Sequence, residues 1–239
     1  MEYICENIFV WHGDKKNDYR TLLKERQAIQ LSHLVIPYER LVRMEQTAGD
    51  VIVNVNDAHA GAGFIDNVPE IPLADAMITN TKNLFLCVRT ADCFPILIYD
   101  KKQKAIAAVH SGREGTRLNI LGKTIQKMID EFKCQSNDLH IVIGAGISAN
   151  HYEVDKNTYH HFYKSNSEIL SQEFIEKKFN ESSYKINIPE MLSFQLEAEK
   201  IKNNQIQLIP ECTYENQNYF SFRRDKGNNR QLSVIGIIQ

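Results

Sequence analysis

Three apolar segments of five residues each follow one another between residues 84 and 109, and they limit the possible folds more than any other feature. They cover residues 84–88, 95–99 and 105–109, with a polar turn at 100–103 between the last two. Runs of this length, rich in Val, Ile and Leu, are typical of strands, because helices are usually at least twice as long. We therefore expect a sheet in the core of the protein.

Strand and helix patterns alternate along the rest of the chain. We expect further strands at 4–11, 41–44, 51–55, 139–143, 219–223 and 233–238, and helices at 18–31, 115–132, most of 151–179, and 188–201, where Pro189 suits a helix start. Residues 46–50 suit a turn, and 58–72 suit a loop able to cover a pocket. No repeat or flexible linker interrupts this order, so we expect one α/β (α+β) domain over 1–239, a layered sandwich with mixed sheets.

The charge pattern excludes some partners. The chain has 28 basic and 30 acidic residues, a net charge of −2, and no basic stripe that could neutralise a phosphate backbone. No apolar run approaches the ~20 residues needed to span a bilayer, and the first residues do not form a secretory signal. We expect a cytoplasmic protein that binds neither nucleic acid nor membrane, while the sequence leaves the oligomeric state open.

Five cysteines occur, at positions 5, 87, 93, 134 and 212, without CxxC spacing. A cytoplasmic protein is kept reduced, so we expect no disulfides and interpret most of these cysteines as small buried side chains. Cys93 is the exception, because it stands between two of the predicted strands and is followed by Pro95. Junctions of this kind bring side chains to the protein surface.

His110 follows the third apolar run directly. If 95–99 and 105–109 pair as a hairpin, the open end of the hairpin places Cys93 beside His110. Such a pair can activate a thiol nucleophile or bind zinc, and the spacing does not choose between these uses. The spacing is equally compatible with purely structural roles, in which Cys93 is a buried side chain and His110 caps a loop.

The remaining candidates carry weaker signals. His160 and His161 point to different faces of a predicted helix, which favours surface positions, and nothing requires His12 or His59 in a site. The Gly-Ala-Gly at 144–146 is half of a dinucleotide fingerprint and is better explained by a tight backbone turn. Arg223 and Arg224 could hold an anion or form a solvated surface.

Taken together, the motifs resemble those of the laccase-domain (YfiH-like) family. The similarity rests on residues 74–79, 90–95, 110–116, 144–147, 152–154, 212–214 and 220–224, in the order of the family. This resemblance implies a mixed α/β sandwich and a zinc ion held by one cysteine and two histidines, with copper as another possibility. Cys93 and His110 take two of the three ligand places.

The third ligand place departs from the family pattern. The family's Gln-x-His turn corresponds here to Gln46-Thr47-Ala48, so Ala48 stands where a histidine is expected. Alanine has no donor atom, which implies a lost or weakened metal site, a ligand supplied from elsewhere, or a chain that is a deliberate inactivating variant. The block that begins at His110 also lacks the family's tryptophan.

The resemblance implies a purine nucleoside enzyme. The expected reactions are phosphorolysis of adenosine, inosine, guanosine and methylthioadenosine, and deamination of adenosine, with the nucleoside and phosphate as partners. Cys93 and His110 would be catalytic, and Gln46, Asp92 and Arg223 would bind substrate. The alternatives are a metal-independent Cys/His hydrolase or amidase acting on peptidoglycan precursors, a copper-dependent oxidase of phenols, and a binding module without catalysis.

Overall fold

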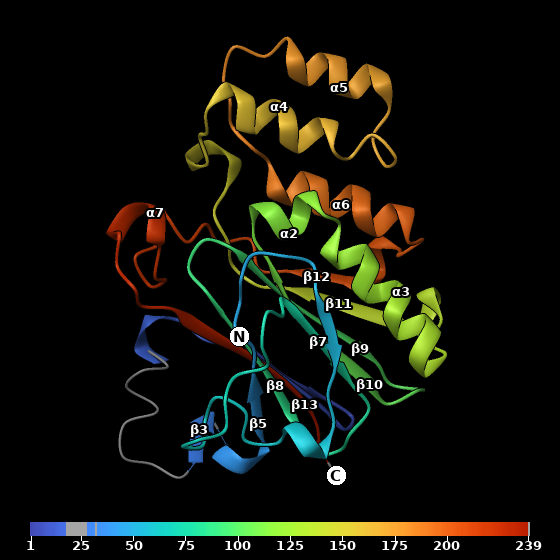
Figure 1. The fold of residues 1–239 in the computed structure, drawn as a ribbon, viewed down its shortest axis with the longest axis vertical. Helices are drawn as coiled ribbons and strands as arrows, with labels where there is room; N and C mark the ends of the chain where they lie inside the picture. The colour runs from blue at the N-terminus through green and yellow to red at the C-terminus, as the bar shows by residue number, and fades with distance from the viewer. Residues whose placement is uncertain (18–27, 32, 239) are drawn as a thin grey trace.

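Two mixed sheets form the centre of the computed structural model, which describes residues 1–17, 28–31 and 33–238 (Figure 1). The six-stranded sheet has the order β12 (Ile206–Leu208), β11 (Leu139–Ile143), β9 (Phe94–Asp100), β10 (Ala105–Ser111), β7 (Ala76–Thr79) and β6 (Ile52–Asn54). The five-stranded sheet has the order β1 (Glu2–Cys5), β2 (Ile8–His12), β13 (Gln231–Ile237), β8 (Phe85–Thr90) and β5 (Leu41–Arg43). This arrangement confirms the predicted mixed α/β class.

The three apolar runs are strands, as predicted. They form β8 in one sheet and the antiparallel neighbours β9 and β10 at the centre of the other. Every residue of β9 and β10 is buried, because helices cover one face of their sheet and the second sheet covers the other. Burial on both faces explains why these strands are continuously apolar rather than alternating.

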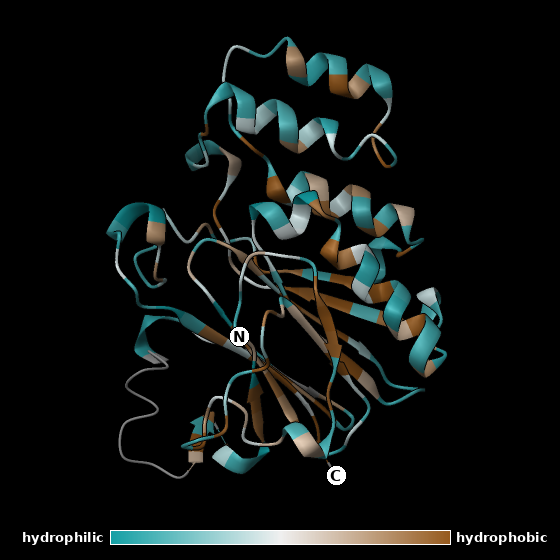
Figure 2. Ribbon diagram, in the orientation of Figure 1, coloured by the Kyte–Doolittle hydropathy of each residue, from teal (hydrophilic) through white to brown (hydrophobic). Residues whose placement is uncertain are grey.

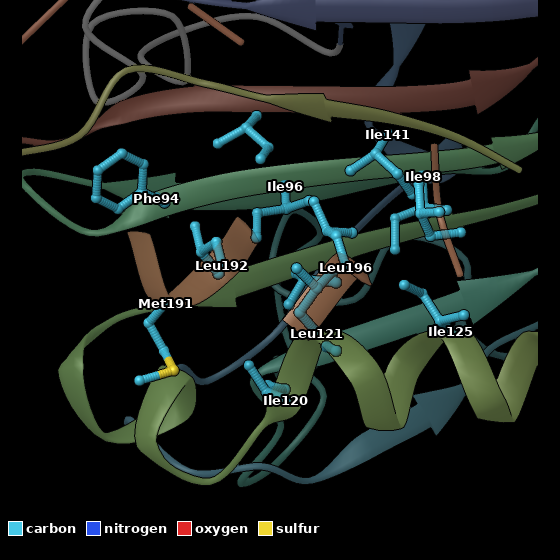
Figure 3. Packing of buried hydrophobic residues seen from close by; sticks show 14 of the residues in the cluster. Phe94, Ile96, Ile98, Ile120, Leu121, Ile125, Ile141, Met191, Leu192 and Leu196 are labelled. Carbon is cyan, nitrogen blue, oxygen red and sulfur yellow. The ribbon is translucent and has the colours of Figure 1, made fainter. Parts of the chain in front are cut away.

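Helices cover the outer face of the six-stranded sheet. Ile96 and Ile98 of β9 pack against Leu121 and Ile125 of α3 (Ile120–Phe132), and against Leu192 of α6 (Ile188–Ala198) (Figure 3). In Figure 2 the central strands consist mainly of hydrophobic residues, while the helices include many hydrophilic residues. The short α2 (Arg113–Arg117) lies beside α3, and α4 (Lys156–Lys164) and α5 (Gln172–Phe179) extend beyond the sheets at one end (Figure 1).

Two predicted elements are split. The single strand at 4–11 is wrong, because β1 and β2 form a hairpin that turns at Glu6, whose φ is 56°. The single helix at 115–132 is also wrong, because Asn119 has a left-handed backbone with φ 57°. Its side chain accepts a hydrogen bond from the Gly122 N–H and caps a new helix, so the chain changes direction between α2 and α3.

Two other predictions fail in type. Residues 28–31 form β3 (Ala28–Leu31), paired with β4 (Leu34–Pro37), so the end of the helix predicted at 18–31 is wrong, and 18–27 lie outside the described residues. The strand predicted at 219–223 is wrong, because α7 (Phe222–Asp225) begins there. The Ser221 hydroxyl accepts from the Arg224 N–H, and this cap outweighs the β propensity of the aromatic residues.

The other predicted elements are present. Strands β5, β6, β11 and β13 lie where the sequence predicts them, α4 and α5 account for the helical region, and α6 begins after the cap residue Asn187 with Pro189 in its first turn. Strands β7 and β12 are short and were not predicted. In the described part of the chain, no helix has the length and apolar character that crossing a membrane requires.

Candidate functional site

The β9–β10 hairpin brings Cys93 and His110 together. His110 pairs with Pro95 across the hairpin, so Cys93 lies just beyond the last paired residues. Both side chains face Gly112, where an added Cβ would lie 3.0 Å from the Cys93 Sγ and 3.7 Å from the His110 Nε2. The predicted contact is therefore confirmed, and it depends on a glycine that leaves room for both side chains.

Asp75 is the third member of this group, and the sequence analysis did not assign it to the site. It lies just before β7 and is completely buried, with its Oδ1 2.7 Å from the His110 Nδ1. The carboxylate can only accept, so the His110 Nδ1 carries the proton and Nε2 is directed to Cys93. The available signal was a single acidic residue in the apolar segment 74–78.

Asp75 also holds the turn at 46–50. Its two oxygens accept hydrogen bonds from the backbone N–H groups of Thr47 (3.2 Å), Ala48 (3.1 Å) and Gly49 (2.6 Å). Ala48 has a left-handed backbone with φ 61°, as a tight turn requires. One carboxylate therefore connects the expected third ligand position to His110.

The electrostatics of the group favour a charged His110. Burial opposes the charge, but the Cys93 sulfur, by its charge and a hydrogen bond, and the Asp75 carboxylate outweigh burial and raise the pKa of His110 to about 9. Burial would raise the pKa of Asp75, but hydrogen bonds from His110, Gly49 and Ala48 outweigh it, so this pKa lies below its ordinary value. These contacts therefore favour an imidazolium at His110 beside the Asp75 carboxylate.

Two cavities meet at Cys93. Cavity A, of about 320 Å³, is lined by Ala91, Asp92, Cys93, Phe94, Ser111, Gly112, Arg113, Ile147, Tyr152, Ile188, Phe222, Arg223 and Lys226. Cavity B, of about 460 Å³, is lined by Gln46, Arg89, Thr90, Ala91, Cys93, His110, Phe222, Asn228 and Arg230. Ala91, Cys93 and Phe222 line both cavities, so they form the boundary between them. The loop at 58–72, predicted to cover a pocket, lines neither of these two cavities.

Arg223 and Asp92 both line cavity A. The Arg223 guanidinium lies 5.2 Å from the Tyr152 ring centroid and donates to the Glu153 carbonyl. The Asp92 carboxylate accepts from the Thr213 hydroxyl (2.7 Å) and from the Arg223 backbone N–H (2.6 Å). Asp92 thus attaches the start of α7 to the site, while its contact with substrate stays a prediction.

Gln46 lines cavity B, although its amide already has partners. Its Nε2 donates to the Arg89 carbonyl at 2.7 Å, and its Oε1 accepts from the Arg89 N–H at 2.9 Å. This reciprocal pair fixes the turn at 46–50 against the end of β8. A substrate contact by Gln46 would use the remaining hydrogen-bonding capacity of the amide.

A family model described as multi-copper polyphenol oxidoreductase laccase matches residues 10–238. This chain belongs to that laccase-domain family. A purine nucleoside phosphorylase of Bacteroides thetaiotaomicron is 31% identical over 226 residues, 93% of this chain and 80% of that protein. Purine nucleoside phosphorylase Cj1217c of Campylobacter jejuni is 34% identical over 164 residues, 67% of this chain and 66% of that protein.

Solved structures of similar proteins share the fold. YlmD of Geobacillus stearothermophilus superposes with a TM-score of 0.79 at 21% identity, covering 98% of this chain and 93% of YlmD. The hypothetical protein YfiH of Bacillus licheniformis gives 0.78 at 23% identity, covering 96% and 92%. The mixed α/β sandwich is thus the fold of this laccase-domain chain.

The laccase-domain family implies a metal, and the donor set of this member does not fit the expected three-ligand site. Position 48 has only a methyl group, and the Asp75 oxygens are occupied by His110 and the turn. Within the described ranges, no group of three His, Cys, Asp or Glu side chains could hold a metal ion. Cys93 and His110 are the two donors that remain for zinc or copper.

The other sequence candidates lie apart from the site of this laccase-domain chain. His12, His59, His160 and His161 line neither cavity A nor cavity B. His160 stacks on Phe179 at 4.4 Å and is half-buried, so its predicted surface position is wrong, while His161 is exposed as predicted. Gly146 serves close packing, since a Cβ there would lie 2.6 Å from the Phe94 ring.

Proposed function

We propose that this chain is a purine nucleoside phosphorylase with its reaction centre at Cys93, His110 and Asp75. The observation that carries the proposal is cavity A, which joins apolar and aromatic walls to cationic side chains beside Cys93. Relatives that carry the name purine nucleoside phosphorylase support it. The expected substrates are adenosine, inosine, guanosine and methylthioadenosine, each with phosphate.

Cavity A has the size and chemistry for a nucleoside. Its volume of about 320 Å³ lies within the roughly 300–1,000 Å³ of small-molecule sites. Ile147, Ile188 and Tyr152 offer flat apolar surface for a purine, and the cation above Tyr152 holds that ring in place. The polar groups around Cys93 would then face the ribose.

The reaction requires a proton for the leaving base. A phosphate oxygen forms a bond to C1′ of the ribose as the bond from C1′ to the purine nitrogen breaks, which yields the free purine and ribose 1-phosphate. His110 lines cavity B and lies beside Cys93, where the two cavities meet. From there its Nε2–H would protonate the purine nitrogen that leaves C1′, because Asp75 holds the opposite ring nitrogen. A proton from the attacking phosphate restores the imidazolium.

The first test is turnover of the four nucleosides with and without phosphate, followed as the free base and the sugar 1-phosphate, which is ribose 1-phosphate for three of them and 5-methylthioribose 1-phosphate for methylthioadenosine. We expect phosphate-dependent cleavage that is lost in His110→Ala and retained in Cys212→Ala, since Cys212 lines neither cavity. Inosine formed from adenosine would report deamination at the same site. No cleavage of any nucleoside by the folded wild-type chain would contradict the proposal.

The role of zinc is tested at position 48. We expect Ala48→His, which supplies the third donor beside Cys93 and His110, to raise bound zinc from well below one to about one ion per chain, because three ligands hold zinc far better than two. Zinc content and turnover are measured side by side for both proteins. Activity that appears only in the zinc-loaded variant would show that the wild-type chain is an impaired metalloenzyme.

A cysteine hydrolase or amidase is the second candidate. It is supported by the spatial arrangement of the site, in which His110 lies between Cys93 and Asp75. The Cys93 sulfur would attack a carbonyl carbon and form a thioester, while His110 protonates the leaving amine and water then hydrolyses the thioester. This activity needs no phosphate and would be abolished in Cys93→Ala. Amide cleavage in the absence of phosphate would favour it over phosphorolysis.

A further inference from the structure

Cavity B has the composition of an anion site. Its nine lining residues include Arg89 and Arg230 and contain no Asp or Glu, whereas cavity A combines the cations Arg113, Arg223 and Lys226 with the carboxylate of Asp92. We propose that cavity B is the phosphate subsite and that Arg230 is its principal ligand. This inference rests on the proposed function and assigns its second substrate to a separate cavity.

Arg230 has donors to spare. Its Nη1 donates to the carbonyls of Gly227 (3.1 Å) and Asn229 (2.8 Å), which fix the side chain without neutralising it. Among the residues described by the structure, no carboxylate forms an ion pair with Arg230. A half-buried guanidinium with a fixed position and free N–H groups suits bidentate binding of a phosphate.

Arg89 adds to the positive potential of cavity B. Its Nη2 lies 2.8 Å from the Glu70 Oε2, and the other oxygen of Glu70 lies 3.0 Å from the Arg43 Nε. Two guanidinium groups therefore share the Glu70 carboxylate. Arg89 is bound in place, so it attracts an anion without having to move.

The Thr90 hydroxyl is an unpartnered polar group in the same wall. Thr90 is 1% exposed and lines cavity B, and within the described part of the chain its Oγ1 has no hydrogen-bond partner. Buried hydroxyl groups are normally paired, so an orphaned one indicates a missing ligand or water.

Phe222 divides the two cavities. It is 48% exposed, lines both cavities, and has the Lys226 Nζ and the Arg230 guanidinium carbon each 5.7 Å from its ring centroid. Lys226 lines cavity A and Arg230 lines cavity B. Displacement at C1′ needs the nucleophile and the leaving base on opposite sides of the carbon, and two cavities that meet at Cys93 provide these sides.

The two cations on Phe222 give a matched pair of variants. Phosphate binding is measured without nucleoside, by equilibrium dialysis of ³²P-phosphate, for wild type, Arg230→Gln and Lys226→Gln. We expect Arg230→Gln to weaken phosphate binding about tenfold or more and Lys226→Gln to change it less than about twofold, because only Arg230 lines cavity B. In turnover, KM for phosphate should rise in Arg230→Gln while KM for the nucleoside stays within about twofold.

Two outcomes would overturn the proposal that cavity B is the phosphate subsite. One is unchanged phosphate binding in folded Arg230→Gln, and the other is a larger loss in Lys226→Gln, which would place phosphate in cavity A. Thermal unfolding of each variant shows whether it is folded. Arg230-dependent phosphate binding without nucleoside cleavage would leave the subsite in place and contradict the proposed function instead.

Discussion

At the scale of single residues, Asp75 accepts hydrogen bonds from two parts of the site. Its carboxylate binds the His110 ring on one side and the backbone of residues 47–49 on the other. A buried carboxylate in this position fixes the ring orientation, so that Nε2 faces Cys93. Asp75 therefore acts as a positioning residue for the proposed proton donor.

Asp75→Asn should impair both stability and turnover. The amide nitrogen cannot accept hydrogen bonds, so at least one N–H of the turn or the His110 ring loses its partner, at a cost of about 2–4 kcal/mol in the free energy of unfolding. We expect kcat to fall more than KM changes. Thr47→Val is the control, because it removes only one hydroxyl contact to the same carboxylate. Urea unfolding measures the stability of both variants, and steady-state kinetics measure their turnover. Equal losses in Asp75→Asn and Thr47→Val would count against a positioning role for Asp75.

At the scale of secondary structure elements, α7 depends on a loop that precedes β9. Asp92 has a left-handed backbone with φ 86°, and its side chain binds the Arg223 N–H at the start of α7. Ser221 caps the same helix, and Phe222 and Arg223 then reach the cavities. The position of two cavity-lining side chains thus depends on one carboxylate more than 120 residues away in the sequence.

Asp92→Ala should release the start of α7. The variant loses hydrogen bonds to Thr213 and Arg223 and keeps a left-handed backbone that alanine disfavours, so we expect a loss of about 1–3 kcal/mol in the free energy of unfolding. Since Arg223 lines cavity A, KM for the nucleoside should rise with it. Asp138→Ala, which removes an ion pair with Lys102 far from either cavity lining, is the control and should leave KM unchanged.

At the scale of the whole molecule, the two sheets pack face to face, and His12 lies at the end of this interface. It belongs to β2 of one sheet, and a Cβ on Gly144, which follows β11 of the other sheet, would lie 2.7 Å from its Nδ1. The Nδ1 is 2.8 Å from the Ser233 hydroxyl. Burial, assisted by the charge of the N-terminal ammonium, lowers the pKa of His12 to about 3.

This buried histidine should make the fold sensitive to acid. The unfolded chain binds a proton at His12 near pH 6.5 and the folded chain only near pH 3, so the contribution of His12 is intact above about 6.5 and is lost as the pH falls toward 3. The comparison variant is His12→Asn, which keeps a hydrogen-bond partner for Ser233. As the pH falls from about 6.5 to 4, we expect the free energy of unfolding to decrease less in this variant than in wild type. The difference between the two proteins should grow by up to about 1.4 kcal/mol per pH unit. Urea titrations across this range, with His161→Asn as control, measure the difference. Parallel pH profiles for wild type and His12→Asn would contradict it.

The sequence by itself determined the features that depend on neighbouring residues. The five-residue apolar runs became β8, β9 and β10, and the short turn between the last two placed Cys93 beside His110. Hairpin pairing is local, so residue order and length were sufficient for this part of the site. The resemblance to the laccase-domain family also drew attention to Ala48, which stands where that resemblance implies a ligand histidine.

Only the tertiary structure decided what depends on distant segments. Asp75 reaches His110 through the pairing of β7 with β10, and cavity B joins Gln46, Arg89 and Arg230 from three separate parts of the chain. Burial lowers the pKa of His12, whereas the contacts of His110 with Cys93 and Asp75 raise the pKa of His110. These outcomes arise from desolvation and from contacts between segments far apart in sequence, which no local pattern contains.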